Sequence, residues 1–247
     1  MVTSPPYWGV RDYGALRQIG MEPRIDSYVE NVVATFDQVR RVLRDDGTVW
    51  LNMGDVYASG NRRYRADDGK YAARAMPTRP RTPVGLKPKD LVGVPWRLAF
   101  ALQRAGWYLR TDIVWHKTNA LPESVADRPW RSHEYLFLFS KNKHYRFSSR
   151  KLLATAPTLR RSVWSMASGR SRINGHSAVF PESLVSPCIN ASTKKGDIVL
   201  DPFCGTGTVA RVCAGSGRRF VGIEINPEYV RAAARQLRAL VASRFKQ

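Results

Sequence analysis

Apolar residues recur along this chain at two spacings, one typical of helices and the other typical of strands. From residue 27 to residue 43 they return every three or four positions, which predicts an amphipathic helix with one face in a core. The positions that carry this period are Val29, Val32, Val33, Phe36, Val39 and Leu43. Ser27 and Glu30 have the spacing of a capping box, so the helix is expected to begin at Ser27 and to be ended by Gly47.

Short apolar runs predict strands between the helices. The expected strands span residues 48–52, 108–115, 135–140, 198–201 and 220–224. Further helices are expected over residues 91–105 and after Asn226 and Pro227, which suit an N-cap and a first helical position. Strands that alternate with helices predict an α/β fold, and 247 residues are enough for a single domain over residues 1–247.

Two polar residues stand where the strand over residues 48–52 is expected to end. Asn52 is its last residue, and Asp55 follows three positions later. Ligands of α/β sheets bind at the carboxyl ends of the strands. Asp55 is therefore expected either to approach a bound ligand or simply to start the following turn.

Two segments lose the periodic spacing and accumulate basic residues. Residues 57–89 interleave tyrosines with basic side chains, and residues 150–172 hold six basic residues and no acidic one. We predict that both are basic insertions that contact a nucleic-acid backbone, the alternative being solvated inserts without function. The arginines expected to make these contacts are Arg62, Arg63, Arg65, Arg160, Arg161, Arg170 and Arg172.

The overall charge favours the same kind of partner. Forty Lys and Arg residues against twenty Asp and Glu residues give a net charge of +20 and an isoelectric point near 10.5. Such a balance attracts polyanions and says little about the fold. Nucleic acid is the predicted partner, and a generally basic surface is the alternative.

The cysteines and histidines do not predict a metal site. Cys188, Cys204 and Cys213 have no C-x-x-C spacing, and the four histidines share no ligand spacing. An odd number of cysteines, with no apolar run of 18 residues and no leader sequence, is typical of a cytoplasmic protein without a membrane span. We predict neither a metal nor a membrane partner.

A strand followed by a glycine-rich turn lies at residues 198–208. Glycines that open a helix at the end of a strand present backbone N–H groups to a ligand. Glu224 ends another predicted strand about 20 residues later, where a ribose diol is commonly held. This order indicates a nucleotide-type site. Because Gly205 to Ala210 also fits the pattern G-x-G-x-x-A, NAD is one candidate ligand.

A stiff arm is predicted at Ser4-Pro5-Pro6-Tyr7, because proline lacks a backbone N–H and holds the residue before it extended. The Ser4 hydroxyl and the Pro5 carbonyl can accept hydrogen bonds beside the flat ring of Tyr7. Acceptors around the amine of a planar base favour a pyramidal nitrogen whose lone pair can attack, while the ring stacks on the base. An ordinary proline-rich turn is the alternative.

Taken together, these stretches resemble the amino-methyltransferases of DNA, in the permuted order where the catalytic motif precedes the cofactor motif. The motifs are T-S-P-P-Y-W from Thr3, L-N-M-G-D from Leu51, W-H-K-T-N-A-L-P-E-S from Trp115, R-S-H-E-Y-L-F-L-F-S-K from Arg131, H-S-A-V-F-P-E-S-L from His176, D-P-F-C-G-T-G-T from Asp201 and G-I-E-I-N-P-E-Y from Gly222. Each motif is short, but their order and spacing cover most of the chain. The resemblance implies a Rossmann-like fold with a mixed, mostly parallel sheet and helices on both faces.

The resemblance also implies S-adenosylmethionine as the cofactor and double-stranded DNA as the partner, with the target base flipped out of the duplex. The cofactor-binding residues that it implies are Asp201, Pro202, Phe203, Gly205, Thr206, Gly207, Thr208 and Glu224, with Phe180 and Pro181 at the methionine end. The implied catalytic residues are Ser4, Pro5, Pro6 and Tyr7, and Lys117 and Asn119 are expected to line the target pocket. Serine at the first position of the tetrapeptide is associated in this family mainly with N4 of cytosine.

Several alternatives stay open at this point. The first is the same reaction on N6 of adenine. The second is a methyltransferase scaffold that has lost its activity and only binds DNA. The third is an NAD oxidoreductase, which would leave the Ser4 to Tyr7 arm unexplained. Cys188 follows a proline, as the nucleophile of cytosine-C5 methyltransferases does, but the glutamine that usually comes next is missing. We therefore interpret Cys188 as a small buried hydrophobe.

One departure from the family pattern lies at the start of the chain. Relatives usually have another strand and a G-D turn ahead of the catalytic motif, whereas only Met1, Val2 and Thr3 precede Ser4. Either the natural start lies upstream, or the sheet lacks an edge strand and cofactor binding is weakened. The sequence also leaves open whether a cognate restriction endonuclease accompanies the protein and whether it is a monomer or a homodimer.

Overall fold

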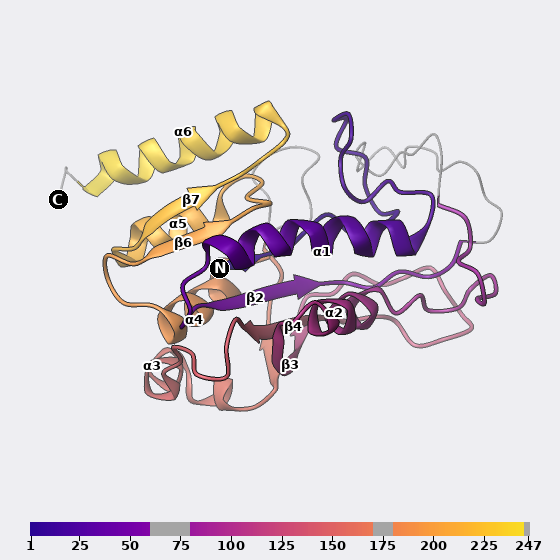
Figure 1. Cartoon of the computed structure of the whole chain (residues 1–247), viewed down its shortest axis with the longest axis horizontal. Coiled ribbons are helices and arrows are strands. Elements are labelled where there is room, and N and C mark those ends of the chain that lie inside the picture. The colour runs from indigo at the N-terminus through magenta and orange to yellow at the C-terminus, as the bar shows by residue number, and fades with distance from the viewer. Residues whose placement is uncertain (60–79, 170–179, 245–247) are drawn as a thin grey trace.

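The computed structural model describes residues 1–59, 80–169 and 180–244, which form an α/β structure (Figure 1). The strands are β1 (Val2–Thr3), β2 (Thr48–Met53), β3 (Tyr108–Lys117), β4 (His133–Ser140), β5 (Val163–Met166), β6 (Ile198–Asp201) and β7 (Arg219–Gly222). The helices are α1 (Ile25–Val42), α2 (Val94–Arg104), α3 (Ser149–Thr155), the 3-10 helix η2 (Pro157–Arg160), α4 (Glu182–Ser192), α5 (Thr208–Ser216) and α6 (Pro227–Arg244). Each strand expected from the apolar spacing is found within a few residues of its predicted bounds. None of the helices in these ranges has both the length and the apolar character needed to cross a membrane.

The strands form a mixed sheet that is mostly parallel. Five of them pair in the order β1-β2-β4-β3-β5, and β6 pairs in parallel with β7. Within the described part of the five-stranded sheet, β4 alone runs antiparallel to its neighbours. Figure 1 shows β6 and β7 beside the N-terminus. The short strand β1, at the edge of the five-stranded sheet, contacts β6 of the pair.

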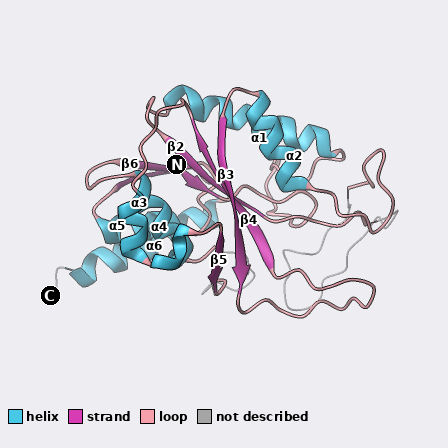
Figure 2. Cartoon of the chain, turned by 90° about the horizontal axis from the view of Figure 1, so that it is seen from below, coloured by secondary structure: helices cyan, strands magenta, loops and turns pink. Residues whose placement is uncertain are grey.

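Both faces of the sheet are buried under helices. Alternate residues of β4 point to opposite faces, because side chains of a strand have a period of two. Phe137 and Phe139 pack with α1 and α2, whereas Leu136 and Leu138 pack with α3, α4 and α5. Figure 2 shows these two groups of helices on opposite sides of the strands. The arrangement confirms the expected fold with helices on both faces.

The predicted N-cap of the first helix, Ser27, is wrong by three residues. Helix α1 begins at Ile25 with Arg24 as its N-cap, and the N–H of Tyr28 donates to the carbonyl of Arg24 at 3.2 Å. Ser27 therefore lies inside the first helical turn and does not cap it. The helix ends at Val42, and Gly47 instead closes the tight turn into β2 by donating its N–H to the carbonyl of Arg44.

The basic segment from residue 150 is more regular than its sequence indicates. It contributes most of α3, then η2, and then β5, which pairs in parallel with β3 at the edge of the sheet. Trp164 anchors β5, since its ring is buried and its Nε1 donates to the carbonyls of Leu159 and Arg161. These elements are too short to show a period. Arg160 and Arg161 are exposed on this segment, while Arg170 and Arg172 lie outside the described residues.

The ends of the other basic segment lie side by side. Tyr57 forms a bridge with Leu91, and Ala58 exchanges two backbone hydrogen bonds with Lys89 and Asp90. The chain between these ends therefore leaves and re-enters the domain at one place. Arg62, Arg63 and Arg65, which were expected to contact DNA, lie outside the described residues.

A buried hydrogen bond joins β1 to β6. The Thr3 hydroxyl donates to Oδ1 of Asp201 at 2.6 Å, and the backbone N–H of Phe203 donates to the same oxygen at 3.1 Å. Burial raises the pKa of Asp201 from 3.8 to about 7, while the Thr3 hydrogen bond acts in the opposite direction. Because this folded-state pKa lies above the unfolded value, ionisation of Asp201 opposes folding. Its contribution therefore lowers stability as the pH rises from about 4 to about 7.

Thr3→Val should lower the free energy of unfolding by about 1–3 kcal/mol, because a buried carboxylate loses a hydrogen bond. The lost bond favours the ionised carboxylate, so its removal raises the Asp201 pKa further. The loss should therefore be larger above pH about 8 than below pH about 6. Urea unfolding followed by circular dichroism at both pH values measures the difference. Thr155→Val, at the exposed end of α3, is the matched control. An equal loss at both pH values would contradict this account.

Candidate active site

A cavity of about 740 Å³ opens along the edge of the sheet where the parallel strands end. The arm from Ser4 to Tyr7 follows β1, Lys117 is the last residue of β3, and Glu224 follows β7. Glu134 reaches the same edge from the start of β4, because that strand runs in the opposite direction. The carboxyl ends of parallel strands are where α/β sheets bind ligands.

Most of the residues predicted from the sequence to form the site line this cavity. They are Ser4, Pro5, Pro6, Tyr7, Lys117, Asn119, Phe180, Pro202, Phe203, Gly205, Thr206, Thr208 and Glu224. The structure thus brings the predicted catalytic arm, the predicted cofactor loop and the predicted target-pocket residues into one space. Arg160 and Arg161 are not among the lining residues.

Three predicted cofactor residues do not line the cavity, and two of them support the glycine-rich loop. Asp201 is buried and holds the Phe203 N–H, as described above. Gly207 is the N-cap of α5 with a φ of 85°, and a Cβ there would lie 3.1 Å from Cβ of Ala233. Pro181 is the N-cap of α4. Asp201 is required as a buried hydrogen-bond acceptor. Position 207 requires glycine because its backbone is left-handed and a side chain would meet Ala233.

Glu224 holds the cofactor half of the cavity together. One of its carboxylate oxygens accepts the N–H of Gly205 at 2.8 Å, and the other accepts the N–H of Asn226 at 2.9 Å. A carboxylate has about four lone-pair positions, so acceptor capacity remains for a pair of hydroxyls. Ile223 and Ile225 flank Glu224 and are 59% and 55% exposed. This part of the cavity therefore presents a carboxylate with free acceptor capacity between two exposed apolar side chains.

Two contacts fix the catalytic arm from behind. The hydroxyl of Tyr28, in α1, donates to the carbonyl of Pro6 at 2.8 Å. Gly20 approaches the arm so closely that a Cβ there would lie 3.2 Å from Cβ of Pro6 and 3.3 Å from the carbonyl oxygen of Tyr7. The Ser4 Oγ lies 3.4 Å from the Tyr7 hydroxyl on the cavity side. The arm is therefore held rigidly before any substrate binds.

Glu134 is a site residue that the sequence interpretation missed. Its Oε2 accepts hydrogen bonds from the Tyr7 hydroxyl at 2.8 Å and from Nδ2 of Asn52 at 3.1 Å. Its Oε1 pairs with the ammonium group of Lys117, which also lies 4.9 Å from the centre of the Trp115 ring. Burial raises the pKa of Tyr7 well above its usual value, and the negative charge of Glu134 raises it further. Tyr7 therefore keeps its proton and donates it.

Close backbone approach makes this network possible. At Gly54, a Cβ would lie 2.7 Å from the Tyr7 ring and 3.2 Å from Oε1 of Glu134. A glycine is needed here for space. The signal in the sequence was the run His133-Glu134-Tyr135, which puts a charged residue at the start of an otherwise apolar strand.

Other candidate residues have structural roles. Asp55 accepts the N–H groups of Gly93 and Val94 and so holds the start of α2, a role that neither alternative from the sequence described, and it does not line the cavity. Asn119 accepts from both the backbone and the hydroxyl of Ser168, tying the end of β3 to the end of β5. Cys188 is fully buried in α4, and burial raises the pKa of its thiol. Within the described ranges no cluster of His, Cys, Asp or Glu could hold a metal ion.

The sheet, the glycine-rich loop after β6 and the arm that faces it define the class of Rossmann-like methyltransferases. Solved structures share this fold. One is the PvuII DNA methyltransferase (cytosine-N4-specific), with a TM-score of 0.70 and 22% identity over 94% of this chain and 77% of that chain. Another is the putative DNA modification methylase TTHA0409 of Thermus thermophilus, complexed with S-adenosyl-L-methionine, with a TM-score of 0.65 and 22% identity over 97% and 85% of the two chains.

The chain matches the family model described as DNA methylase, of the N6 and N4 methyltransferases, over residues 1–235, and it belongs to that family. It is 57% identical over 241 residues to the Type II methyltransferase M.XycI of Xanthomonas campestris pv. cyanopsidis. It is 55% identical over 241 residues to M.Cfr9I of Citrobacter freundii. Both alignments cover 96% of this chain and 80% of the relative. The protein is thus a DNA amino-methyltransferase that uses S-adenosylmethionine, and the NAD alternative is removed.

The Glu134 network yields a stability prediction. Glu134→Gln keeps the shape of the side chain but leaves the Lys117 ammonium without its charge partner, so the free energy of unfolding should fall by about 1–3 kcal/mol. Adding Lys117→Met should cost less than the sum of the two single changes, because the two side chains are coupled. Urea unfolding of the three variants measures this coupling.

The matched control is the exposed pair of Lys89 and Asp127, whose replacement by Met and Asn should change stability by about 0–1 kcal/mol. Strictly additive losses at Glu134 and Lys117 would show that their ion pair contributes nothing.

Proposed function

We propose that this protein methylates the exocyclic N4 amine of cytosine in duplex DNA. The observation that carries the proposal is the cavity lined both by the arm from Ser4 to Tyr7 and by the loop from Pro202 to Thr208. A serine at the first position of the arm favours cytosine over adenine. The name of the PvuII enzyme, which shares the fold and is cytosine-N4-specific, supports the same choice.

The arm suits an extruded base. The Ser4 hydroxyl and the Pro5 carbonyl accept the two amine hydrogens, which turns the nitrogen lone pair away from the base plane. The Tyr7 ring stacks on the base, and Glu134 and Asn52 fix the plane of that ring through its hydroxyl. Because the acceptors are preorganised, little reorganisation is needed when charge develops on the nitrogen.

The opposite side of the cavity suits the cofactor. S-adenosylmethionine, when bound, would supply a methyl group from its positively charged sulfur. The carbon–sulfur bond would break as the amine nitrogen bonds to the methyl carbon, leaving a neutral thioether, and the nitrogen would then release one proton. Glu224 accepts the ribose hydroxyls, and Phe180 and Pro181 lie toward the methionine end. No covalent bond to the protein is required, which is consistent with the burial of Cys188 and the hydrogen bond from its thiol to the carbonyl of Leu184.

Positive charge draws the protein to DNA. The net charge of +20 is large for a chain of this length, and phosphate contacts supply most of the affinity of such proteins. Lys117 and Asn119 line the cavity where the flipped base enters. Further contacts to the backbone are assigned to the predicted DNA-binding arginines, which are Arg62, Arg63, Arg65, Arg160, Arg161, Arg170 and Arg172.

The relatives suggest the biological setting. M.XycI and M.Cfr9I are named Type II methyltransferases. We therefore infer a cytoplasmic modification enzyme whose methyl mark protects DNA from a cognate restriction endonuclease with the same target sequence.

Glu224→Ala should weaken S-adenosylmethionine binding by more than about tenfold, or roughly 1.4 kcal/mol, because the ribose loses its acceptor. Isothermal titration calorimetry measures the affinity. Since Glu224 also holds two backbone N–H groups, a thermal melt must first show that the variant is folded. Glu228→Ala, in the first turn of α6, is the matched control. Unchanged affinity in a folded Glu224→Ala protein would remove Glu224 from the cofactor site.

The chemistry is tested by single-turnover transfer of labelled methyl to duplex DNA, followed by nucleoside analysis. Tyr7→Ala should lose about 1–3 kcal/mol of stacking with the base. Ser4→Ala should slow transfer while leaving cofactor affinity nearly unchanged, because the lost hydrogen bond matters mainly in the transition state. Tyr7→Phe keeps the ring and should retain much of the activity.

The labelled product decides between the targets. Label in N4-methylcytosine supports the proposal, and label in N6-methyladenine selects the alternative target. Label in 5-methylcytosine would overturn the mechanism. No transfer by folded protein that binds both the cofactor and DNA would favour a scaffold that has lost its activity.

A further inference from the structure

The segment from Gly9 to Gly20 is a closed surface loop that grows directly out of the catalytic arm. The N–H of Gly9 donates to the carbonyl of Gly20 at 2.8 Å, which joins the two ends of the loop. As described above, Gly20 packs so closely against Pro6 and Tyr7 that a Cβ at this position would press on both. A compact loop whose ends meet in this way is often functional.

Hydrogen bonds inside the loop hold its tip in a fixed shape. The Oε1 of Gln18 accepts the N–H groups of Tyr13 and Ala15 at 2.8 and 3.3 Å, and Asp12 accepts the N–H of Gly14 at 2.8 Å. The N–H of Gln18 donates to the carbonyl of Ala15 and closes the tip as a tight turn. The tip is therefore ordered by its own side chains.

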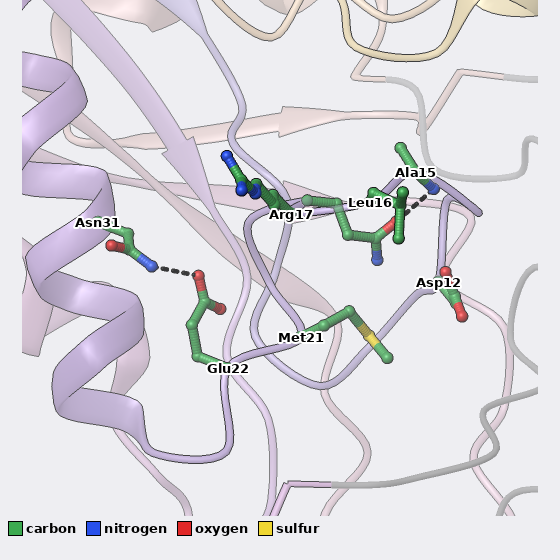
Figure 3. Close-up of a pocket in the computed structure, with 8 residues that line it drawn as sticks. Asp12, Ala15, Leu16, Arg17, Met21, Glu22 and Asn31 are labelled. Atoms are coloured by element: carbon green, nitrogen blue, oxygen red, sulfur yellow. Dashed lines mark hydrogen bonds between the residues drawn. The ribbon is translucent and has the colours of Figure 1, made fainter.

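The two residues at the centre of this turn are turned outward. Leu16 is 94% exposed. Arg17 is exposed and has a φ of 59°, a left-handed conformation that is uncommon for a residue other than glycine. Figure 3 shows Ala15, Leu16 and Arg17 at the tip, with Glu22 turned toward Asn31 of α1 at the base. Strained backbone that the surroundings hold in place is concentrated at functional sites.

The tip stands at the rim of the active-site cavity. Arg17 and Gln18 line that cavity, and together with Leu16 they also line a shallower hollow of about 500 Å³ beside it. The Arg17 side chain is exposed and lines the cavity, so its guanidinium is accessible to a phosphate. An apolar tip beside a cation, at the mouth of a pocket for a flipped base, has the composition of a DNA wedge.

We propose that Leu16 enters the duplex and fills the gap that the flipped base leaves in the stack, while Arg17 binds a neighbouring phosphate. The inference rests on the proposed base-flipping function and adds the element that opens the duplex. Because the loop is joined to Pro6 and Tyr7 through Gly20, its tip is held in a fixed position relative to the arm.

The test compares two duplexes built around a base that wild-type protein methylates, as located by single-molecule sequencing. In one duplex the target base is paired, and in the other it faces an abasic site, so that less stacking and pairing must be broken. Leu16→Ala should slow single-turnover methylation of the paired duplex by at least about tenfold and should restore most of the rate on the abasic duplex. Leu16→Met, which keeps an apolar wedge, should behave like wild type.

Val84→Ala is the matched control, because Val84 is 98% exposed on another loop and does not line the cavity. Calorimetry should show that Leu16→Ala binds S-adenosylmethionine as wild type does. A weaker cofactor complex would make the loop a cofactor lid and would overturn the wedge. An equal loss on both duplexes, or no loss on either, would overturn it as well.

Extrusion can be followed without any chemistry. With a fluorescent base analogue at the target position that keeps the pairing of the target base, wild-type protein should raise the fluorescence of the paired duplex, and Leu16→Ala should lose most of that increase. If wild type transfers no methyl group but raises the fluorescence, the proposed reaction fails while the wedge stands. If fluorescence is the same for both proteins, the wedge fails whatever the reaction is.

Discussion

The hydrogen bond between Thr3 and Asp201 joins residues that are 198 positions apart in the chain. It places β1 beside β6, so the arm from Ser4 to Tyr7, which follows the first strand, shares a cavity with the glycine-rich loop, which follows the second. Both groups are almost completely buried, and a buried carboxylate is costly unless it is hydrogen-bonded. The geometry of the whole site therefore depends on a contact that touches neither ligand.

A second, partly buried carboxylate organises the side of the cavity assigned to the target base. Glu134 contacts the phenol of Tyr7, the amide of Asn52 and the ammonium group of Lys117, which lie on or directly after three different strands. Each of these groups satisfies part of the capacity of the carboxylate, which is how a charge is kept in a partly buried place. Its effect on the site is to fix the ring of Tyr7, because the phenol cannot rotate away without losing a charge-assisted hydrogen bond.

The loop from Gly9 to Gly20 packs against the Ser4 to Tyr7 arm at its base and is exposed at its tip. It shares its base with the catalytic arm, and Asn226 next to the cofactor loop donates to the carbonyl of Tyr13 within it. Tyr13 also meets Tyr229 of α6 edge to face. The loop is thus anchored on both sides of the cavity, while its tip remains at the surface.

Much of the fold could be predicted from the sequence, because periodic apolar positions and glycines act locally. Strands β2, β3, β4, β6 and β7, the helix after the glycine-rich loop and the arm from Ser4 to Tyr7 were placed from such local signals. The start of α1 was missed because an ordinary Arg24 provides the N-cap without a side-chain bond, whereas Ser27 only imitates a cap. The elements within residues 150–166 were missed because each is too short for a repeating pattern of apolar positions to be recognised.

The sequence by itself determined the residue types of the site, since an S-P-P-Y arm, a glycine-rich loop and Glu224 each have a chemical signature at fixed spacing. Only the tertiary structure decided which polar residues enter the cavity. Asp55 and Asp201 hold backbone N–H groups and do not line the cavity, whereas Glu134 lines it. The physical reason is that a carboxylate's role depends on burial and on donors from distant strands, and these neighbours are set by the packing of the sheet.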